Sequence, residues 1–247
     1  MRIETPLVFL VLIAAVVATG CQQIPATTKA RAISDEAAQR APKKAVSKSD
    51  GVYGPPTKLA ELEDKAIDES SGLAASRTSP GCYWTHNDSG NGPIIYAFDS
   101  GGRRRGTWRV TGAKSDDWED IAVGPGPKPN QSYLYIGDIG DNTGNRSEIV
   151  VYRIPEPVIP QSDSSSTSAR PQPTEPAEAI RLRYPDGKHD SEALLVHPQT
   201  GKIYLVTKEV PFINPSIYAA VILQDLFRPV TLTSLGQLEM PGLLGGT

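Results

Sequence analysis

The chain has 247 residues, with 25 Lys and Arg against 28 Asp and Glu, so its formal net charge at pH 7 is −3. This weakly acidic balance offers no basic surface to a phosphate backbone and implies no nucleic-acid partner. Only two cysteines occur, Cys21 and Cys82. A framework of several disulfides is therefore excluded, and the folded part must be stabilised by core packing.

The chain opens with a short basic and then apolar segment. After Arg2, an apolar stretch runs from Leu7 to Val17, which suits a signal-peptide h-region but is too short for a bilayer, which needs about 20 residues. It ends in Ala18-Thr19-Gly20-Cys21, which resembles the lipobox of bacterial lipoproteins, although that box usually opens with Leu. The resemblance implies that residues 1–20 are removed and that Cys21 is acylated with fatty acids such as palmitate.

A lipidated Cys21 would hold the protein on a membrane, because each buried CH₂ of its acyl chains contributes about 0.8 kcal/mol. By analogy with lipoproteins, the absence of Asp after this cysteine favours the outer membrane over the inner one. We therefore expect an exported, membrane-anchored protein at the outer membrane, the cell surface or in the periplasm. Ordinary secretion after cleavage near Ala18 is the alternative. Signal removal takes away Arg2 and Glu4, so the mature chain keeps a net charge of −3.

Two segments have a composition that does not support a hydrophobic core. Residues 21–56 are rich in Ala, Lys, Ser, Thr and Pro without helical or strand periodicity, which predicts a lipidated, disordered tether. A second segment, a Pro/Ser-rich insertion at about residues 155–177, predicts a solvated loop or linker.

The rest of the chain consists of short β-type runs separated by turn signals, which predicts an all-β fold. The turns include Asp99–Gly102 and Gln199–Lys202, which have the composition of hairpin connections. The runs are residues 82–85, 94–98, 133–136, 149–152, 203–206 and 217–221.

One pattern, an acid followed by a run that ends apolar, occurs three times. The copies are Glu69-Ser70-Ser71-Gly72-Leu73-Ala74, Asp117-Trp118-Glu119-Asp120-Ile121-Ala122 and Asp190-Ser191-Glu192-Ala193-Leu194-Leu195. Without the Pro/Ser-rich insertion they recur about every 50 residues, which is in the range of a propeller blade. Each copy leads into four predicted strands, as a blade requires. In the third unit the strands are expected at residues 193–196, 203–207, 217–223 and 231–238. A β-sandwich is the alternative.

At these motifs the sequence resembles secreted bacterial β-propellers of the calcium-dependent phytase, NHL and SdiA-regulated type, whose blades open with a motif similar to residues 190–194. The resemblance covers roughly residues 61–247 and implies a partial β-propeller at 57–247. Such propellers usually have six four-stranded blades, whereas three are counted here. A truncated product or partial gene model would explain this, and residues 242–247 look like the approach to a fourth blade. Pairing of two half-propellers is the alternative.

The repeated acids are candidate metal ligands, because first strands of successive blades line one channel and bring equivalent positions together. Glu69, Asp117 and Asp190 would form one tier, Glu119 and Glu192 another, with Asp120 nearby. Carboxylates facing one opening repel each other, and a hard divalent cation offsets that repulsion, so calcium is the first candidate cofactor. Alternatively, these acids accept hydrogen bonds from backbone N–H groups at blade corners.

Polar residues after the second strand of each unit should lie on the same rim. This group contains His86, Asn87, Asp88, Asp138, Asp141, Asn142, Lys208 and Glu209. The spacing of Asp138, Asp141 and Asn142 does not match an EF-hand loop, and capping of local turns is the alternative.

Two functions fit these features. The first is a lipoprotein that binds an envelope ligand or protein through an acidic central rim, with calcium. The second is a calcium-dependent phosphoric-ester hydrolase, which an incomplete propeller would leave inactive. Such an enzyme needs basic groups to hold the ester, and near the acidic motifs stand Lys114, Lys188 and Lys208. No Gly-x-Ser-x-Gly motif supports a serine nucleophile. His86 and His189 adjoin the motifs and could act as an acid or base.

Overall fold

The computed structural model describes residues 57–88, 90–162, 164–208, 214–222 and 227–238. These residues belong to one compact unit, Pro55–Thr247. The expected signal peptide, Cys21, the tether, Glu209 and residues 242–247 lie outside the described residues. The described residues contain strands and no α-helix, so the all-β prediction is confirmed. Within them, no helix of a length and hydrophobicity that could cross a membrane occurs.

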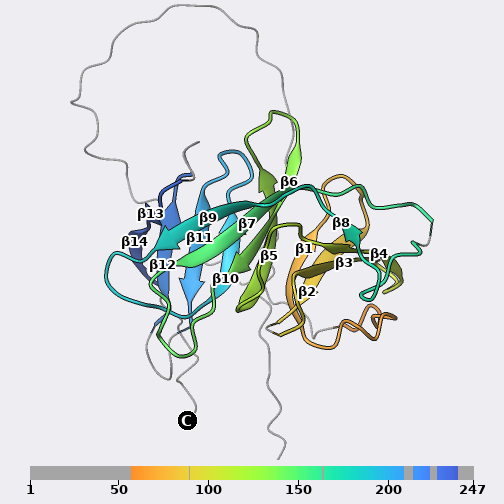
Figure 1. The fold of residues 1–247 in the computed structure, drawn as a ribbon, viewed down its shortest axis with the longest axis horizontal. Helices are drawn as coiled ribbons and strands as arrows, with labels where there is room; N and C mark the ends of the chain where they lie inside the picture. The colour runs from red at the N-terminus through yellow and green to blue at the C-terminus, as the bar shows by residue number, and fades with distance from the viewer. Residues whose placement is uncertain (1–56, 89, 163, 209–213, 223–226, 239–247) are drawn as a thin grey trace, which may run out of the picture. The chain divides into compact units, whose positions relative to one another are not determined.

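The described strands form three sheets (Figure 1), each built on an antiparallel meander of four strands. The first sheet contains β1 (Ser70–Ala75), β2 (Cys82–Asn87), β3 (Ile94–Asp99), β4 (Arg104–Arg109) and β8 (Gln172–Pro173). The second contains β5 (Trp118–Pro125), β6 (Ser132–Asp138), β7 (Ile149–Pro155), β9 (Glu178–Arg183) and β13 (Val230–Thr231). The third contains β10 (Ser191–Val196), β11 (Ile203–Thr207), β12 (Ser216–Ala220) and β14 (Thr233–Gln237). They form no closed ring of blades, so the blade count stays a prediction.

The two hairpins expected from turn composition both form. In the β3–β4 turn, Gly102 N donates to Asp99 O at 2.9 Å, and Gly102 has a φ of 81°, a conformation that glycine adopts without strain. In the β10–β11 turn, Gly201 has a φ of 68° and its N donates to His197 O at 3.0 Å. Turn chemistry therefore sets the register of the first and third meanders.

The repeat seen in the sequence is also a structural repeat. The pairing of each first strand shifts in register directly after its first residue, at Ser70, Trp118 and Ser191. The acid before each strand uses its backbone oxygen in the same way. Glu69 O accepts from Asp88 N at 3.0 Å, Asp117 O from Ile139 N at 3.1 Å, and Asp190 O from Lys208 N at 2.7 Å. Equivalent positions in the three units can therefore be compared directly.

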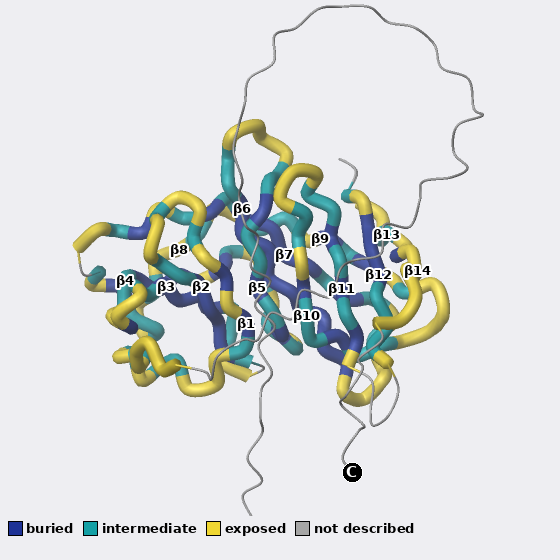
Figure 2. Tube along the Cα trace, turned by 180° about the vertical axis from the view of Figure 1, so that it is seen from behind, coloured by how far each residue is buried: buried dark blue, intermediate teal, exposed yellow. Residues whose placement is uncertain are grey.

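Two apolar cores lie between the three sheets and pack them together. The core between the first and second sheets contains Trp84 and Trp108, whose rings lie 5.0 Å apart, together with Trp118. The core between the second and third sheets contains Tyr135 and Leu205. The second sheet is thus covered on both faces (Figure 2), which explains why its inner strands β6 and β7 are buried along most of their length rather than at alternate residues.

The first strands of the three meanders lie side by side, with β5 between β1 and β10. Ser71 Oγ donates to Glu119 O at 2.7 Å, which joins β1 to β5. Leu194 N donates to Asp120 Oδ2 at 2.8 Å, which joins β5 to β10. A Cβ on Gly72 would lie 2.4 Å from Ile121 N, so β1 approaches β5 closely only because residue 72 has no side chain. This packing brings the acidic ends of the strands together.

The segment at about residues 155–177, expected to be a solvated loop or linker, is a loop that is exposed or half-buried at most residues but also contacts the first sheet. The segment crosses to the first sheet, where β8 pairs in parallel with β4 and Thr174 N donates to Arg109 O at 3.0 Å. Ile159 and Ser166 are buried there, and Ser166 Oγ accepts from Thr107 N at 2.9 Å. The Pro- and Ser-rich composition did not indicate these contacts, because they are made to residues distant in sequence.

The third unit repeats this arrangement. The connection between β12 and β14 crosses to the second sheet, where β13 pairs in parallel with β9. Val230–Thr231 is therefore not the start of the fourth strand expected at residues 231–238, and that strand begins at Thr233. In both the second and the third unit, the connection before the fourth strand covers the outer edge of the preceding sheet, which protects unpaired edge groups.

A buried carboxylate fastens the segment after β7 to the first sheet. Glu156 is 8% exposed, and its Oε1 accepts hydrogen bonds from Trp84 Nε1 at 3.0 Å, Ser76 Oγ at 2.6 Å and Arg77 N at 3.2 Å. Three donors on one carboxylate offset the cost of burying its charge.

We predict that Glu156→Ala lowers the free energy of unfolding by about 1–3 kcal/mol, because it leaves the buried Trp84 Nε1 without an acceptor. Urea unfolding of the full chain measures this change. Glu175→Ala, at an exposed position, serves as the control and should change the free energy by less than about 0.5 kcal/mol. Equal effects of the two substitutions would contradict the role of Glu156.

Candidate metal centre

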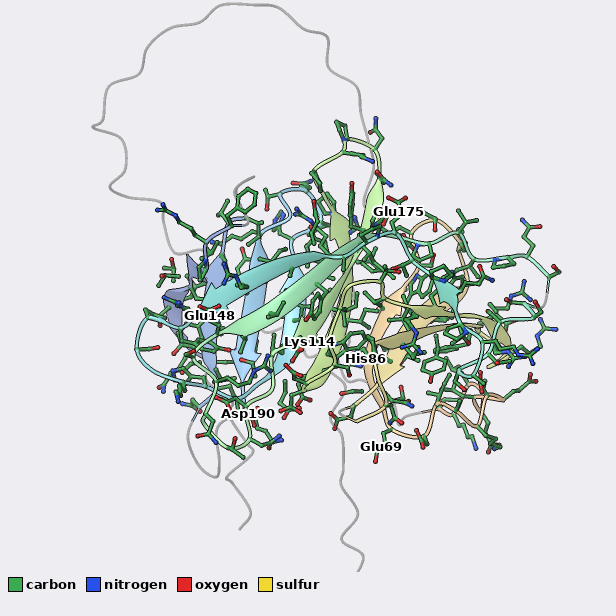
Figure 3. All side chains as sticks on the ribbon, viewed as in Figure 1. Glu69, His86, Lys114, Glu148, Glu175 and Asp190 are labelled. Carbon is green, nitrogen blue, oxygen red and sulfur yellow. The ribbon has the colours of Figure 1, made fainter. Side chains whose placement is uncertain are left out.

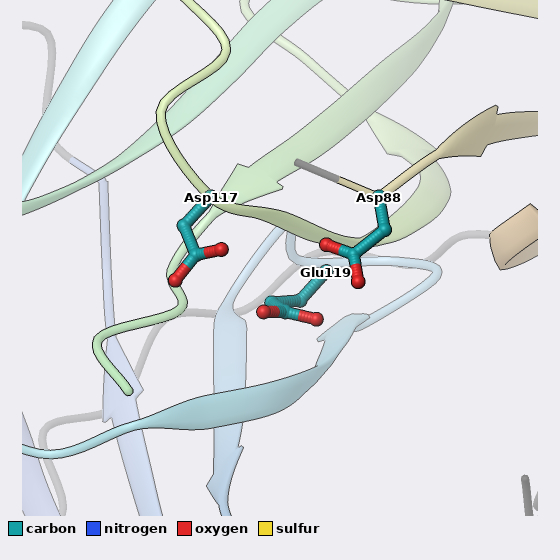
Figure 4. A group of neighbouring side chains, drawn as sticks. All are labelled: Asp88, Asp117 and Glu119. Atoms are coloured by element: carbon teal, nitrogen blue, oxygen red, sulfur yellow. The ribbon is translucent and has the colours of Figure 1, made fainter. Parts of the chain in front are cut away.

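Five carboxylates gather where the ends of β5 and β10 meet the loop after β2. Asp88, Asp117 and Glu119 each place one oxygen within 4.8 Å of the others (Figure 4), and so do Glu119, Asp190 and Glu192. Glu119 belongs to both groups. We call these five residues the carboxylate cluster. It lies at the end of the sheets where Figure 3 labels Asp190, opposite the end where it labels Glu175.

The local fold places two consecutive buried side chains at the start of β5. Trp118 is fully buried in the first core, with its ring 5.5 Å from that of His86. Glu119 is only 5% exposed and faces Glu192 of the third sheet. Trp118 thus anchors the strand end and holds the carboxylate that follows at a buried position.

The electrostatics of the cluster are unfavourable without a cation. Among the described residues, Glu192, another acid, is the hydrogen-bonding partner of the Glu119 carboxyl group, and no nitrogen donor reaches it. Burial first, and then the charges of Glu192, Asp88 and Asp117, raise the pKa of Glu119 to about 9. Burial, Asp88 and Asp190 also raise the pKa of Asp117. In the absence of a cation, the Glu119 carboxyl group is therefore protonated at pH 7.

The β6–β7 loop closes over two of these acids. A Cβ on Gly140 would lie 2.4 Å from Glu119 Oε1 and 2.5 Å from Asp117 Oδ2. Only glycine allows this approach, because any side chain would displace both carboxylates. Gly140 is thus a determinant of the cluster geometry rather than a flexible linker residue.

Two basic side chains border the cluster. Lys208 Nζ lies 2.6 Å from Glu192 Oε1, and this contact first of all raises the pKa of Lys208. Arg146 Nη1 donates to Asp138 Oδ1 and to Gly140 O, both at 2.8 Å. Sequence reasoning missed Arg146, which belongs to no motif. The available signal was a single arginine in the acidic loop that follows β6.

The structure brings together four of the six acids predicted as ligands, Asp117, Glu119, Asp190 and Glu192, and adds Asp88 from the predicted rim group. Glu69 is exposed and belongs to neither group. Asp120 is close in sequence, but its carboxylate accepts from Leu194 N and Ile121 N, both at 2.8 Å. Burial raises the pKa of Asp120 to about 7 against these two hydrogen bonds.

Three other residues of the predicted rim group form hydrogen bonds to the backbone. Asp138 accepts from Asp117 N at 3.0 Å, Asp141 accepts from Asn145 N at 2.8 Å, and Asn87 Nδ2 donates to Ala66 O at 2.7 Å. Asn142 is exposed. The Asp141 bond caps a local turn, which was the alternative to metal binding, whereas the bonds of Asp138 and Asn87 join residues 21 apart in sequence.

The two histidines near the motifs differ in setting. His86 is fully buried, and burial lowers its pKa, so it is neutral at neutral pH. His189 Nε2 lies 3.1 Å from Asp186 Oδ1 and 3.0 Å from Tyr218 Oη, beside the cluster residue Asp190. Neither histidine belongs to the carboxylate groups.

No protein-family model, curated protein or solved structure matches this chain. The interpretation of the cluster therefore depends on its own geometry and charge.

We predict that, with a chelator present, the free energy of unfolding falls as the pH rises from about 5 to about 9. Folding raises the pKa of Glu119 from 4.5 to about 9 and that of Asp120 from 3.8 to about 7. Groups with a raised pKa contribute stability that is complete below the unfolded value and lost as the pH passes the folded value. Urea unfolding at several pH values measures the trend.

Glu119→Gln should flatten this dependence, because the amide does not titrate, whereas Glu175→Gln should leave it unchanged. A stability that is constant or rises over this range would contradict the prediction.

Proposed function

We propose that this chain is a membrane-anchored binding protein whose carboxylate cluster holds a calcium ion and uses it to recognise an oxygen-rich ligand of the cell envelope. The observation that carries this proposal is the placement of Glu119. It is 5% exposed, it is shared by both carboxylate groups, and no nitrogen donor of the described residues reaches it. A buried carboxylate among carboxylates is stable only when protonated or bound to a cation.

Calcium is the cation that this ligand chemistry favours. Both groups offer carboxylate oxygens alone, without histidine or cysteine. Hard cations prefer such oxygens, and Ca²⁺ takes six to eight ligands in flexible geometry, whereas Mg²⁺ demands a near-ideal octahedron. The contributing residues come from two first strands and one loop, and such a site can adjust to the larger ion.

The proposed architecture is a β-propeller of which the three sheets are consecutive blades. Three features support it: the meander order within each sheet, the adjacency of β1, β5 and β10, and the crossing of β8 and β13 to the preceding sheet. In such a fold the cluster would stand at the mouth of the central channel. A ligand could then complete the coordination of the ion.

The proposed location follows from the N-terminal sequence. Acylation of Cys21 would tie the chain to the outer membrane or cell surface, and residues 22–56 would let the folded part reach ligands at a distance. A glycan or protein of the envelope is the expected partner, because its hydroxyl and carboxylate oxygens suit a calcium-bridged contact.

We predict that CaCl₂ at 100 times its dissociation constant stabilises the full chain by about 2.7 kcal/mol at pH 7.5. Isothermal titration calorimetry gives the dissociation constant, and chemical unfolding gives the stabilisation. Glu119→Gln should abolish both effects, because it removes the carboxylate shared by the two groups. Glu175→Gln, which removes an exposed acid, should retain them. Absence of calcium binding by the unaltered, folded chain would refute the proposal.

A second candidate function is hydrolysis of phosphoric esters, which the basic residues beside the cluster favour. Arg146 and Lys208 both contact acids at this end of the sheets and could hold an anionic ester near a bound ion. We predict calcium-dependent release of phosphate from an aryl phosphate, reduced at least about 100-fold by Asp117→Asn combined with Glu119→Gln. A rate that the double substitution leaves unchanged would exclude this activity at the cluster.

A further inference from the structure

The two carboxylate groups that share Glu119 differ in one respect. In the group of Glu119, Asp190 and Glu192, an ammonium is already present, because Lys208 Nζ lies 2.6 Å from Glu192 Oε1. Glu119 itself, at 5% exposure, has no nitrogen donor among the described residues. Lys208 thus contacts a carboxylate of one group directly. Arg146 instead bonds Asp138 and Gly140 O, and its charge counteracts the burial that raises the pKa of Asp117 in the other group.

The structural repeat shows where this difference comes from. Lys208 and Asp88 occupy the same position in their units, since each donates its backbone N–H to the acid that precedes the first strand. In the first unit this position supplies a carboxylate, which joins Asp117 and Glu119. In the third unit it supplies an ammonium, which pairs with Glu192. The same position of the repeat thus provides a candidate metal ligand, Asp88, in the first unit and a cation, Lys208, in the third.

We propose that Lys208 is a tethered cation that fills the Glu119–Asp190–Glu192 side of the cluster and so limits the cluster to one divalent ion, at Asp88, Asp117 and Glu119. This inference rests on the proposed function, because it specifies how many ions the same cluster binds. Removal of the ammonium would open the second side to a second ion.

The charges agree with this assignment. The five ionised carboxylates carry −5, and Lys208 with one divalent ion brings the sum to −2. Without the ammonium, one ion leaves −3, so the attraction for a second ion is stronger. Lys208 and Glu192 are 47% and 30% exposed, so their contact is screened and weak on its own. However, a tethered group has an effective concentration on the order of millimolar, which suffices against a weakly bound second ion.

Equilibrium dialysis of the full chain against radioactive CaCl₂, with calorimetry, tests the inference. The unaltered chain should bind one ion and Lys208→Gln should bind two. Lys188→Gln is the matched control, because it removes the same charge from a neighbouring lysine whose Nζ contacts the backbone oxygen of Asn145 rather than a carboxylate. The control should bind one ion. Lys208→Arg, which keeps the charge, should also bind one.

The outcomes separate this inference from the proposed function. One ion in both the unaltered chain and Lys208→Gln would overturn the role of Lys208 and leave the calcium site intact. Two ions in the unaltered chain would also overturn it. No ion in either chain would overturn both proposals. Unfolding with a chelator present verifies that Lys208→Gln folds, and an alternative Lys208→Met tests the same loss of charge if it does not.

Discussion

The close packing of β1, β5 and β10 is the constraint on which the rest of this structure depends. Gly72 lets β1 approach the backbone of β5, and hydrogen bonds from Ser71 Oγ and Leu194 N join the three strands. Each bond links neighbouring sheets at the start of their first strands. The same contacts that assemble the cores therefore also force the acidic strand ends together, so packing energy offsets the electrostatic repulsion at the cluster.

Sequence periodicity could predict the class of fold and much of the cluster, because the repeat is carried by local patterns. Acids at one position before three β-runs converge if their strands are equivalent, and this reasoning found Asp117, Glu119, Asp190 and Glu192. It could not find the place of residues 156–177 or of Val230–Thr231. Those segments pair with a preceding sheet over two residues each, and such short pairings leave no periodic signal.

The hydrogen-bond donors around each acid distinguish acids that stabilise the fold from acids that are available to bind a ligand. Asp120 and Glu119 are neighbours in sequence and are both largely enclosed. Two backbone N–H groups bond Asp120, yet none from the described residues reaches the carboxyl group of Glu119. Residue type and position in the sequence do not distinguish Asp120 from Glu119 as a metal ligand. The difference arises because Asp120 meets the backbone N–H of Leu194 in β10, whereas Glu119 meets the carboxyl group of Glu192 in the same strand, and both contacts depend on how the sheets pack.

The units of the repeat differ most at the positions that surround the cluster. Ser71, Glu119 and Glu192 are equivalent, and so are Asp88, Ile139 and Lys208. The equivalent position that follows in the first strands stays apolar, as Leu73, Ile121 and Leu194, and Ile121 and Leu194 are buried in the cores between the sheets. The polar positions face no such demand, and their side chains determine charge and coordination instead. The repeat is therefore conserved between units in the core but differs at the strand ends where β5 and β10 meet. There, an acid or a lysine at one equivalent position sets the local charge.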